Sequence, residues 1–194
     1  MLRVKEHYLT KTISDMAKCE ILKPFIRSWE GGFANIPFDK GGPTKWGVTI
    51  GTFRSVYGKS KTVDDLKAMT EEQWMHIYKV YFWDRWRADE IECQALANIL
   101  VDWVWASGAP GVRNVQRMLG VKVDGVVGPK TLAALNGWSR GSRDLFDKIK
   151  LIRTAFINSI AVGTQARFKK GWSRRLGAIQ YNQLVCNGGS IIKF

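Results

Sequence analysis

Two neighbouring stretches of the chain, WEGGF at residues 29–33 and DKGGPTKWGVT at residues 39–49, predict how the polypeptide is arranged. Upstream of the first stretch, apolar residues recur every three or four positions from residue 13 to residue 29. This spacing predicts an amphipathic helix that ends at Glu30 and the two glycines after it. Pro24 inside the pattern predicts a kink or a fresh helix start. The second stretch is rich in glycine and is followed by a β-branched run, which is typical of a loop and a short β-hairpin.

Two carboxyl side chains lie in opposite surroundings within these stretches. Glu30 follows Trp29 at the end of an apolar helix, and such surroundings disfavour the ionised form, so we expect a protonated carboxyl that can act as a general acid. Asp39 lies in a glycine-rich loop, where water and backbone N–H groups favour the ionised form. Glycoside hydrolysis uses such a pair, and the hydroxyl of Thr44 is placed to hold a water. The alternative is that Glu30 is a solvated charge at a helix end.

The rest of the chain reads as helices. Thr70 and Gln73 form a capping box that begins a helix, and the nearly all-apolar stretch 92–106 predicts a buried central helix. Pro129 is expected in the first turn of another helix, and amphipathic patterns predict two more at 145–160 and 171–181. The tail after residue 185 is expected to be loose at its glycines. We therefore predict one mainly α fold with a short hairpin.

Several kinds of chemistry lack the residues they need. The chain has two histidines, His7 and His76, neither in a metal-binding or nucleophile motif, and it lacks phosphate-binding glycine motifs. Its three cysteines are widely spaced, which fits neither a disulfide framework nor a metal site. We expect no metal and no cofactor.

The formal net charge of +13 calls for a polyanionic partner such as nucleic acid, anionic lipid or bacterial cell wall. Residues 139–175 carry much of this charge, although such a run is more often a solvated helix face. No nucleic-acid-binding motif is recognisable, so we expect no nucleic-acid partner. We also expect no membrane span, because no apolar run is long enough. The first ten residues lack the apolar stretch of a signal peptide, so we expect release to the wall or periplasm through a holin or a secretion system.

The quoted stretches resemble the EGG and D-x-GG-x-T-x-x-G-I/V-T motifs of glycoside hydrolase family 108, the N-acetylmuramidases. The later string DGVVGPKTL at residues 124–132 resembles the motif of the predicted peptidoglycan-binding module that accompanies this family. The resemblance implies a lysozyme-like, mainly α (α+β) fold with a short hairpin beside the active-site cleft. It implies a catalytic lobe at residues 10–94 and a peptidoglycan-binding-like helical lobe at residues 95–182. Within the second motif, Asp124-Gly125 is also expected to make a turn for purely structural reasons.

The resemblance also implies roles for individual residues. Glu30 becomes the catalytic acid, Asp39 the second carboxylate and Thr44 a residue that positions water or substrate. The chain departs from the expected central-helix pattern D-x-x-x-N-x-G at Ala106, which replaces a polar side chain. We expect core positions for Trp74 and Trp103, and contacts with the sugar from Gly41, Gly42, Trp46, Trp83, Trp86, Asp102 and Trp105.

The implied reaction is hydrolysis of the β-1,4 bond between N-acetylmuramic acid and N-acetylglucosamine in peptidoglycan glycan strands, by a monomer. A lytic transglycosylase is an alternative, although Asp39 and Thr44 argue against it because such enzymes can manage with one acid. A non-catalytic wall-binding or secretion-associated protein is a second alternative. The sequence leaves open whether the reaction inverts or retains the anomeric configuration, because that depends on the separation of the two carboxyls.

Overall fold

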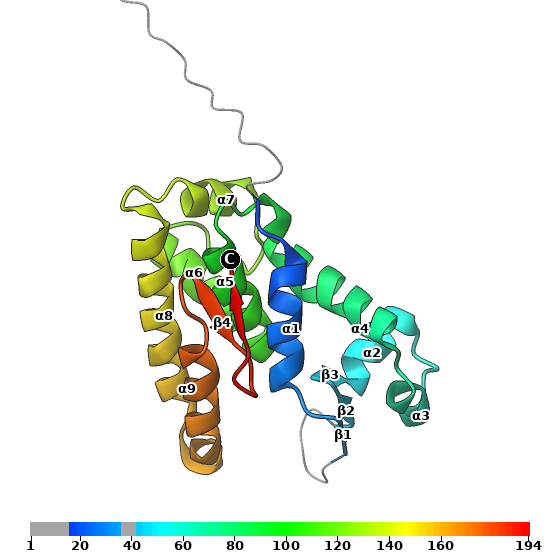
Figure 1. Ribbon diagram of the computed structural model, residues 1–194. Coiled ribbons are helices and arrows are strands. Elements are labelled where there is room, and N and C mark those ends of the chain that lie inside the picture. The colour runs from blue at the N-terminus through cyan, green and yellow to red at the C-terminus, as the bar shows by residue number, and fades with distance from the viewer. Residues whose placement is uncertain (1–15, 36–41) are drawn as a thin grey trace, which may run out of the picture.

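The computed structural model describes residues 16–35 and 42–194. Helix α5 lies at the centre, with α1, the small sheet and α2 to α4 on one side and α8 and α9 on the other (Figure 1). The helices are α1 (Cys19–Trp29), α2 (Ile50–Tyr57), α3 (Val63–Lys67), α4 (Glu71–Tyr78), η2 (Lys79–Trp83), η3 (Asp84–Trp86), η4 (Ala88–Glu90), α5 (Gln94–Ser107), α6 (Pro110–Leu119), α7 (Pro129–Asn136), α8 (Gly141–Ile160), η5 (Gly163–Phe168) and α9 (Lys169–Gly177). The strands are β1 (Phe33–Ala34), β2 (Thr44–Lys45), β3 (Val48–Thr49), β4 (Gln183–Val185) and β5 (Ile191–Lys193).

Helix α5 is the buried central helix that the apolar run predicts. Ten consecutive residues, from Ala95 to Val104, are buried, and the helix contacts α6, α8, η2 and η3. A helix that is apolar nearly all round has no face to offer to water, so it is stable only when other elements surround it. Trp74 and Trp103 are both fully buried, which confirms their predicted core positions.

Helix α1 runs without interruption through Pro24, so a fresh helix start at this residue is wrong. The predicted beginning of the helix near residue 13 lies outside the described residues. The helix ends at Glu30, whose backbone is extended at φ −96° and ψ 137°. The chain therefore leaves the helix directly into β1, and Glu30 lies where the helix meets the sheet.

The predicted hairpin is part of a three-stranded antiparallel sheet in the order β1-β2-β3. Thr44 pairs with Thr49 and Lys45 pairs with Val48, which leaves a two-residue turn of Trp46 and Gly47. Both turn residues have positive φ, 50° and 79°. A two-residue hairpin turn of this kind matches the right-handed twist of the strands, and it favours glycine because L side chains rarely adopt positive φ.

Local signals elsewhere also predict the structure. The Thr70 capping box is formed by both of its hydrogen bonds, and Pro129 begins α7. In the DGVVGP loop, Gly125 has φ 81°. The side chain of Gln116 in α6 donates to Asp124 Oδ1 and to the Val126 carbonyl, both at 3.0 Å. Within the loop, the backbone N–H of Val126 donates to Asp124 Oδ1 at 2.9 Å, as the turn interpretation predicts.

The tail of the chain is ordered, so the prediction of a loose tail is wrong. Strands β4 and β5 form an antiparallel hairpin in which Leu184 pairs with Ile192. The turn between the strands contains Gly188 and Gly189, both at positive φ. Leu184 is buried, and the backbone N–H of Asn187 donates to Ser28 Oγ of α1 at 2.9 Å. The glycines that suggest looseness instead make the turn, and the hairpin packs beside α1 (Figure 1).

Candidate active site

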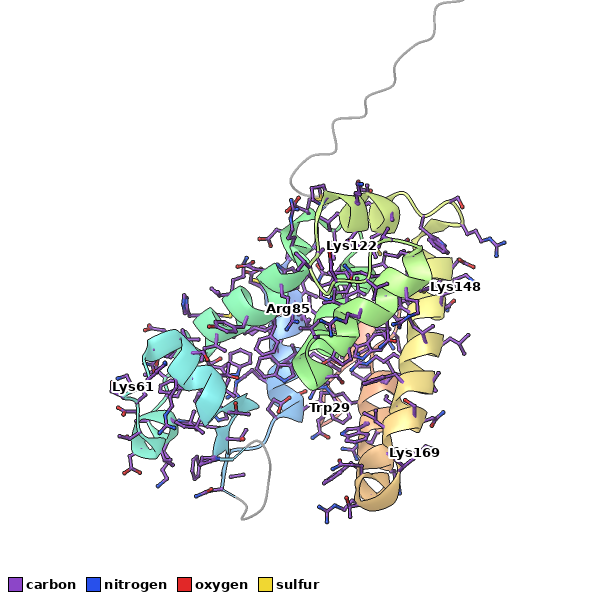
Figure 2. The ribbon with its side chains drawn as sticks, turned by 180° about the vertical axis from the view of Figure 1, so that it is seen from behind. Trp29, Lys61, Arg85, Lys122, Lys148 and Lys169 are labelled. Atoms are coloured by element: carbon purple, nitrogen blue, oxygen red, sulfur yellow. The ribbon has the colours of Figure 1, made fainter. Side chains whose placement is uncertain are left out.

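The candidate site is built around Glu30. Its side chain is 15% exposed, and it lies among the end of α1, the β2–β3 turn, α5 and α9. Figure 2 shows the preceding residue, Trp29, at the end of α1 that faces α9. The carboxyl is largely shielded from bulk water, but its ion pair with Arg175 means that its surroundings are not the purely apolar ones that the sequence predicts.

One oxygen of Glu30 accepts two hydrogen bonds. Oε1 receives the indole N–H of Trp105 at 2.6 Å and the guanidinium Nη1 of Arg175 at 2.7 Å. Charge-assisted hydrogen bonds of this kind are short and directional. Because both donors point at Oε1, a proton that Glu30 carries and gives away belongs on Oε2.

Oε2 lies against the backbone of Gly47 in the β2–β3 turn. A Cβ placed on Gly47 would come within 2.6 Å of Glu30 Oε2 and 2.7 Å of Trp105 Cζ2. These distances are too short for any side chain. Gly47 is therefore required twice, for its positive φ and for the close approach of the turn to the carboxyl.

Replacing Gly47 with Ala is expected to lower activity on cell walls roughly 100-fold, because the methyl group must displace the Glu30 carboxyl by about 1 Å. The positive φ alone is expected to cost about 1 kcal/mol of stability. Rates of turbidity loss and urea unfolding measure the two effects. Gly120→Ala is the matched control, because Gly120 has φ 70° and open space around it. If both variants lost only stability, the close approach at Gly47 would have no catalytic importance.

Arg175 is held by a buried cluster. Asp102, which is fully buried, accepts from Arg175 Nη2 and from Arg153 Nη2, both at 2.7 Å. Burial alone would raise the pKa of Asp102, but the two guanidinium groups outweigh burial and lower it. Burial alone would likewise lower the pKa of Arg175, but Asp102 and Glu30 outweigh it and raise it. Asp102 and Arg175 are therefore both charged, and the cluster fixes the guanidinium beside Glu30.

Asp102 is therefore not a sugar contact, and that prediction is wrong. With no exposed surface, it cannot touch a substrate in this structure. Its carboxylate is fully used by the two arginines. It acts on the site through Arg175, as a residue that positions another.

The predicted sugar contacts of two tryptophans are also wrong. Trp83 and Trp86 are both fully buried in the core, and the indole N–H of Trp83 donates to Asp89 at 2.6 Å. Helical spacing shows that such residues share a face, but it does not show whether that face lines a cleft or the core.

Trp46 and Trp105 lie at the site in other roles. Trp105 donates to Glu30, and its ring packs against Phe82 with centroids 4.5 Å apart. The ring of Trp46 is covered by Arg27 at 4.1 Å and by Lys45 at 4.2 Å. Cations over an indole ring are favourable, but they occupy surface that a sugar would need. A sugar contact from Trp46 or Trp105 stays a prediction.

The remaining predicted site residues come from the loop after β1. Asp39 and Gly41 lie outside the described residues. Gly42 has φ 65°, and its carbonyl accepts from the Thr44 hydroxyl at 3.0 Å. Thr44 lies half-buried in β2, on the strand that leads to the Trp46–Gly47 turn. The catalytic roles of Asp39 and Thr44, and sugar contacts from the two glycines, stay predictions.

Sequence reasoning misses Arg175. It lies 145 positions after Glu30, in a basic stretch whose sequence is typical of a solvated helix face. No local pattern distinguishes it from its neighbour Arg174, which lies over the Trp29 ring at 5.0 Å. Ala106, the departure from the expected pattern, lines a small pocket with Trp103, Trp172 and Arg175. Within the ranges 16–35 and 42–194, no group of three His, Cys, Asp or Glu side chains could hold a metal ion.

Comparisons with known proteins identify the family and support the fold. Residues 24–108 match the family model Glycosyl hydrolase 108, and residues 110–177 match the model Predicted Peptidoglycan domain. A solved structure, described as the structure of Brucella abortus SagA, is similar with a TM-score of 0.74 and 30% identity. The alignment covers 84% of this chain and 92% of that one. No curated protein matches the chain. The expected lysozyme-like, mainly α fold with a short hairpin is confirmed. The chain belongs to glycosyl hydrolase family 108 and is a lysozyme-type glycoside hydrolase that acts on peptidoglycan.

Proposed function

We propose that the protein cleaves the β-1,4 bond between N-acetylmuramic acid and N-acetylglucosamine, with Glu30 as the general acid. The observation that carries this proposal is the arrangement of the Glu30 carboxyl. Oε1 is held by Trp105 and Arg175, so the carboxyl has one orientation and Oε2 is the oxygen that can carry the proton. A fixed, shielded carboxyl of this kind is what protonation of a glycosidic oxygen requires.

The charges of the buried cluster support the same role. When Glu30 is protonated, Asp102 alone balances Arg153 and Arg175, and the cluster carries one excess positive charge. As the proton passes from Oε2 to the glycosidic oxygen, the bond between that oxygen and the anomeric carbon breaks. Glu30 then becomes a carboxylate beside Arg175, and two negative groups face two positive ones. Arg175 therefore stabilises the glutamate after it has given its proton.

The positive charge that develops at the anomeric carbon needs a second group. Following the family resemblance, we assign its support to Asp39 and the positioning of the attacking water to Thr44. Water then adds to the anomeric carbon and loses a proton to a carboxylate, which completes the hydrolysis.

Digestion of purified sacculi, followed by mass spectrometry of the soluble fragments, tests the proposed bond and reaction. We expect fragments that end in reducing N-acetylmuramic acid. Fragments with 1,6-anhydro ends would instead identify a lytic transglycosylase, and reducing N-acetylglucosamine ends would identify the other glycosidic bond. The absence of any fragment would favour a non-catalytic wall-binding protein.

We also propose that the protein works as a monomer and reaches the wall after release from the cytoplasm. Among the described residues, no helix has the length and apolar character needed to cross a membrane. The excess of basic residues supports attraction to the anionic wall, an attraction that salt weakens.

A further inference from the structure

The connection between α8 and α9 forms a tip at one end of the molecule, which we define as residues 160–172. It comprises the last residue of α8, the short helix η5 and the beginning of α9. Figure 2 shows Lys169 at this end, and Figure 1 shows the α8–α9 connection projecting beyond the other helices there. No side chain of the tip contacts Glu30 in the site described above, although Ile160 and Trp172 line the small pocket that Ala106 and Arg175 also line.

The tip exposes apolar side chains. Val162 is 65% exposed, Phe168 is 41% exposed and Ile160 is 36% exposed. The Phe168 ring stacks on Trp172 with centroids 5.7 Å apart. Single exposed apolar residues are common on protein surfaces, but several gathered on one projection favour an interaction surface.

The same region contains no acidic side chain. From residue 148 to residue 194 the sequence has nine Lys and Arg and no Asp or Glu. Arg167, Lys169 and Lys170 of the tip are all exposed. Within the described residues none of these three forms an ion pair, whereas four of the seven lysines and arginines between residues 50 and 90 do, namely Lys61, Lys67, Lys79 and Arg87. Exposed apolar groups therefore lie between unneutralised cations.

We propose that the tip docks on an anionic lipid surface. A lipid headgroup region offers an apolar phase for Ile160, Val162 and Phe168, and negative charge for the three cations. A glycan strand fits the tip less well, because sugar hydroxyls are bound by donors and acceptors together and the tip has few side chains that accept hydrogen bonds. Thr164 and Gln165 are the neutral polar side chains between Val162 and Trp172, and carboxylates are missing from this part of the sequence.

Docking through the tip would also orient the site. The end of α1 that carries Trp29 and Glu30 points toward the same end of the molecule as the tip in both views. A protein held by the tip would therefore present the candidate site close to the lipid surface, where the wall meets the membrane.

Flotation of the full chain with lipid vesicles tests the proposal. We expect the protein to bind vesicles of equal parts phosphatidylglycerol and phosphatidylcholine, and 0.5 M salt to weaken this binding at least tenfold. We expect no binding to vesicles of phosphatidylcholine alone. The double variant Val162→Ser, Phe168→Ser is expected to weaken binding at least tenfold, and so is Lys169→Gln, Lys170→Gln. The matched control is Val123→Ser, Val126→Ser, because these residues are 40% and 67% exposed, just before and within the DGVVGP loop. We expect it to bind within twofold of the parent.

Two further measurements show whether a loss of vesicle binding comes from the tip itself. Thermal unfolding checks that each variant is folded, and fragment release from lipid-free sacculi is expected to be unchanged in the tip variants. The proposal is wrong if the parent does not bind anionic vesicles, or if the tip variants bind as well as the parent. It is also wrong if the tip variants lose binding to sacculi rather than to vesicles, since the tip would then be a glycan-binding surface. Because hydrolysis is measured separately, these outcomes are independent of the function proposed for Glu30.

Discussion

Glu30→Gln is expected to lower the rate of sacculus hydrolysis by about 10²- to 10⁴-fold, the range that general acids contribute. Glutamine has nearly the same shape, and its amide oxygen can still accept from Trp105 and Arg175. It has no acidic proton to give to the glycosidic oxygen, so the chemical step is lost while substrate binding is kept. Rates of release of reducing ends, with binding of the variant to sacculi measured in parallel, separate these two effects.

Glu72→Gln is the matched control, because Glu72 is an exposed residue in the first turn of α4 and its replacement makes the same change from carboxyl to amide. It is expected to keep the parent rate within about twofold, as surface substitutions do. If Glu30→Gln retained more than a tenth of the parent rate while folded, Glu30 would not be the acid.

Asp102→Ala is expected to cost about 3–5 kcal/mol of unfolding free energy, because removing one partner of a buried ion pair leaves an unbalanced buried charge. Here two guanidinium groups, those of Arg153 and Arg175, lose their shared carboxylate. Arg175 then also loses the contacts that fix it beside Glu30, so activity should fall even at temperatures where the variant is folded. Urea unfolding and sacculus hydrolysis at low temperature measure the two effects.

The comparison for this variant is Asp147→Ala, which breaks an ion pair between Arg143 and Asp147 whose side chains are 65% and 54% exposed. Exposed pairs contribute about 0–1 kcal/mol. Equal losses of unfolding free energy in the two variants would mean that the buried Asp102 cluster contributes no more stability than an exposed ion pair.

The pH dependence of stability checks the same cluster. The pKa of Asp102 is lowered in the folded state, so its contribution is present above the ordinary aspartate pKa of about 4 and is lost as the pH falls through the lowered value. The parent is therefore expected to lose stability on acidification below about pH 4. The Asp102→Asn variant should lack this part of the loss of stability at low pH, whereas the Asp147→Ala variant should still show it.

Much of the fold follows from signals that lie close together in the chain. The Thr70–Gln73 capping box, Pro129 at a helix start and the apolar run that becomes α5 each act within a few turns, so the sequence predicts them well. The adjacency of Glu30 to the hairpin follows in the same way, since only the short stretch after β1 separates the two motifs. These features are local because hydrogen bonds and side-chain packing within one element decide them.

The parts that the sequence does not predict depend on distant contacts. Arg175 reaches Glu30 only because α9 folds back along α8, and nothing near residue 175 indicates this. Periodicity groups Trp83 and Trp86 with other apolar residues but does not say which neighbour covers them. The glycines of the tail fit a loose end and a hairpin turn equally well until α1 is in place to pack against it.

The ion cluster that joins the two matched segments has a consequence for how such proteins can be rearranged. Glu30 and Asp102 come from the segment 24–108, and Arg153 and Arg175 come from the segment 110–177. The C-terminal segment therefore supplies contacts that the candidate site needs, and it cannot be exchanged as an independent binding domain. A chimera that takes its two segments from different parents should work only when the aspartate and both arginines are inherited as a set.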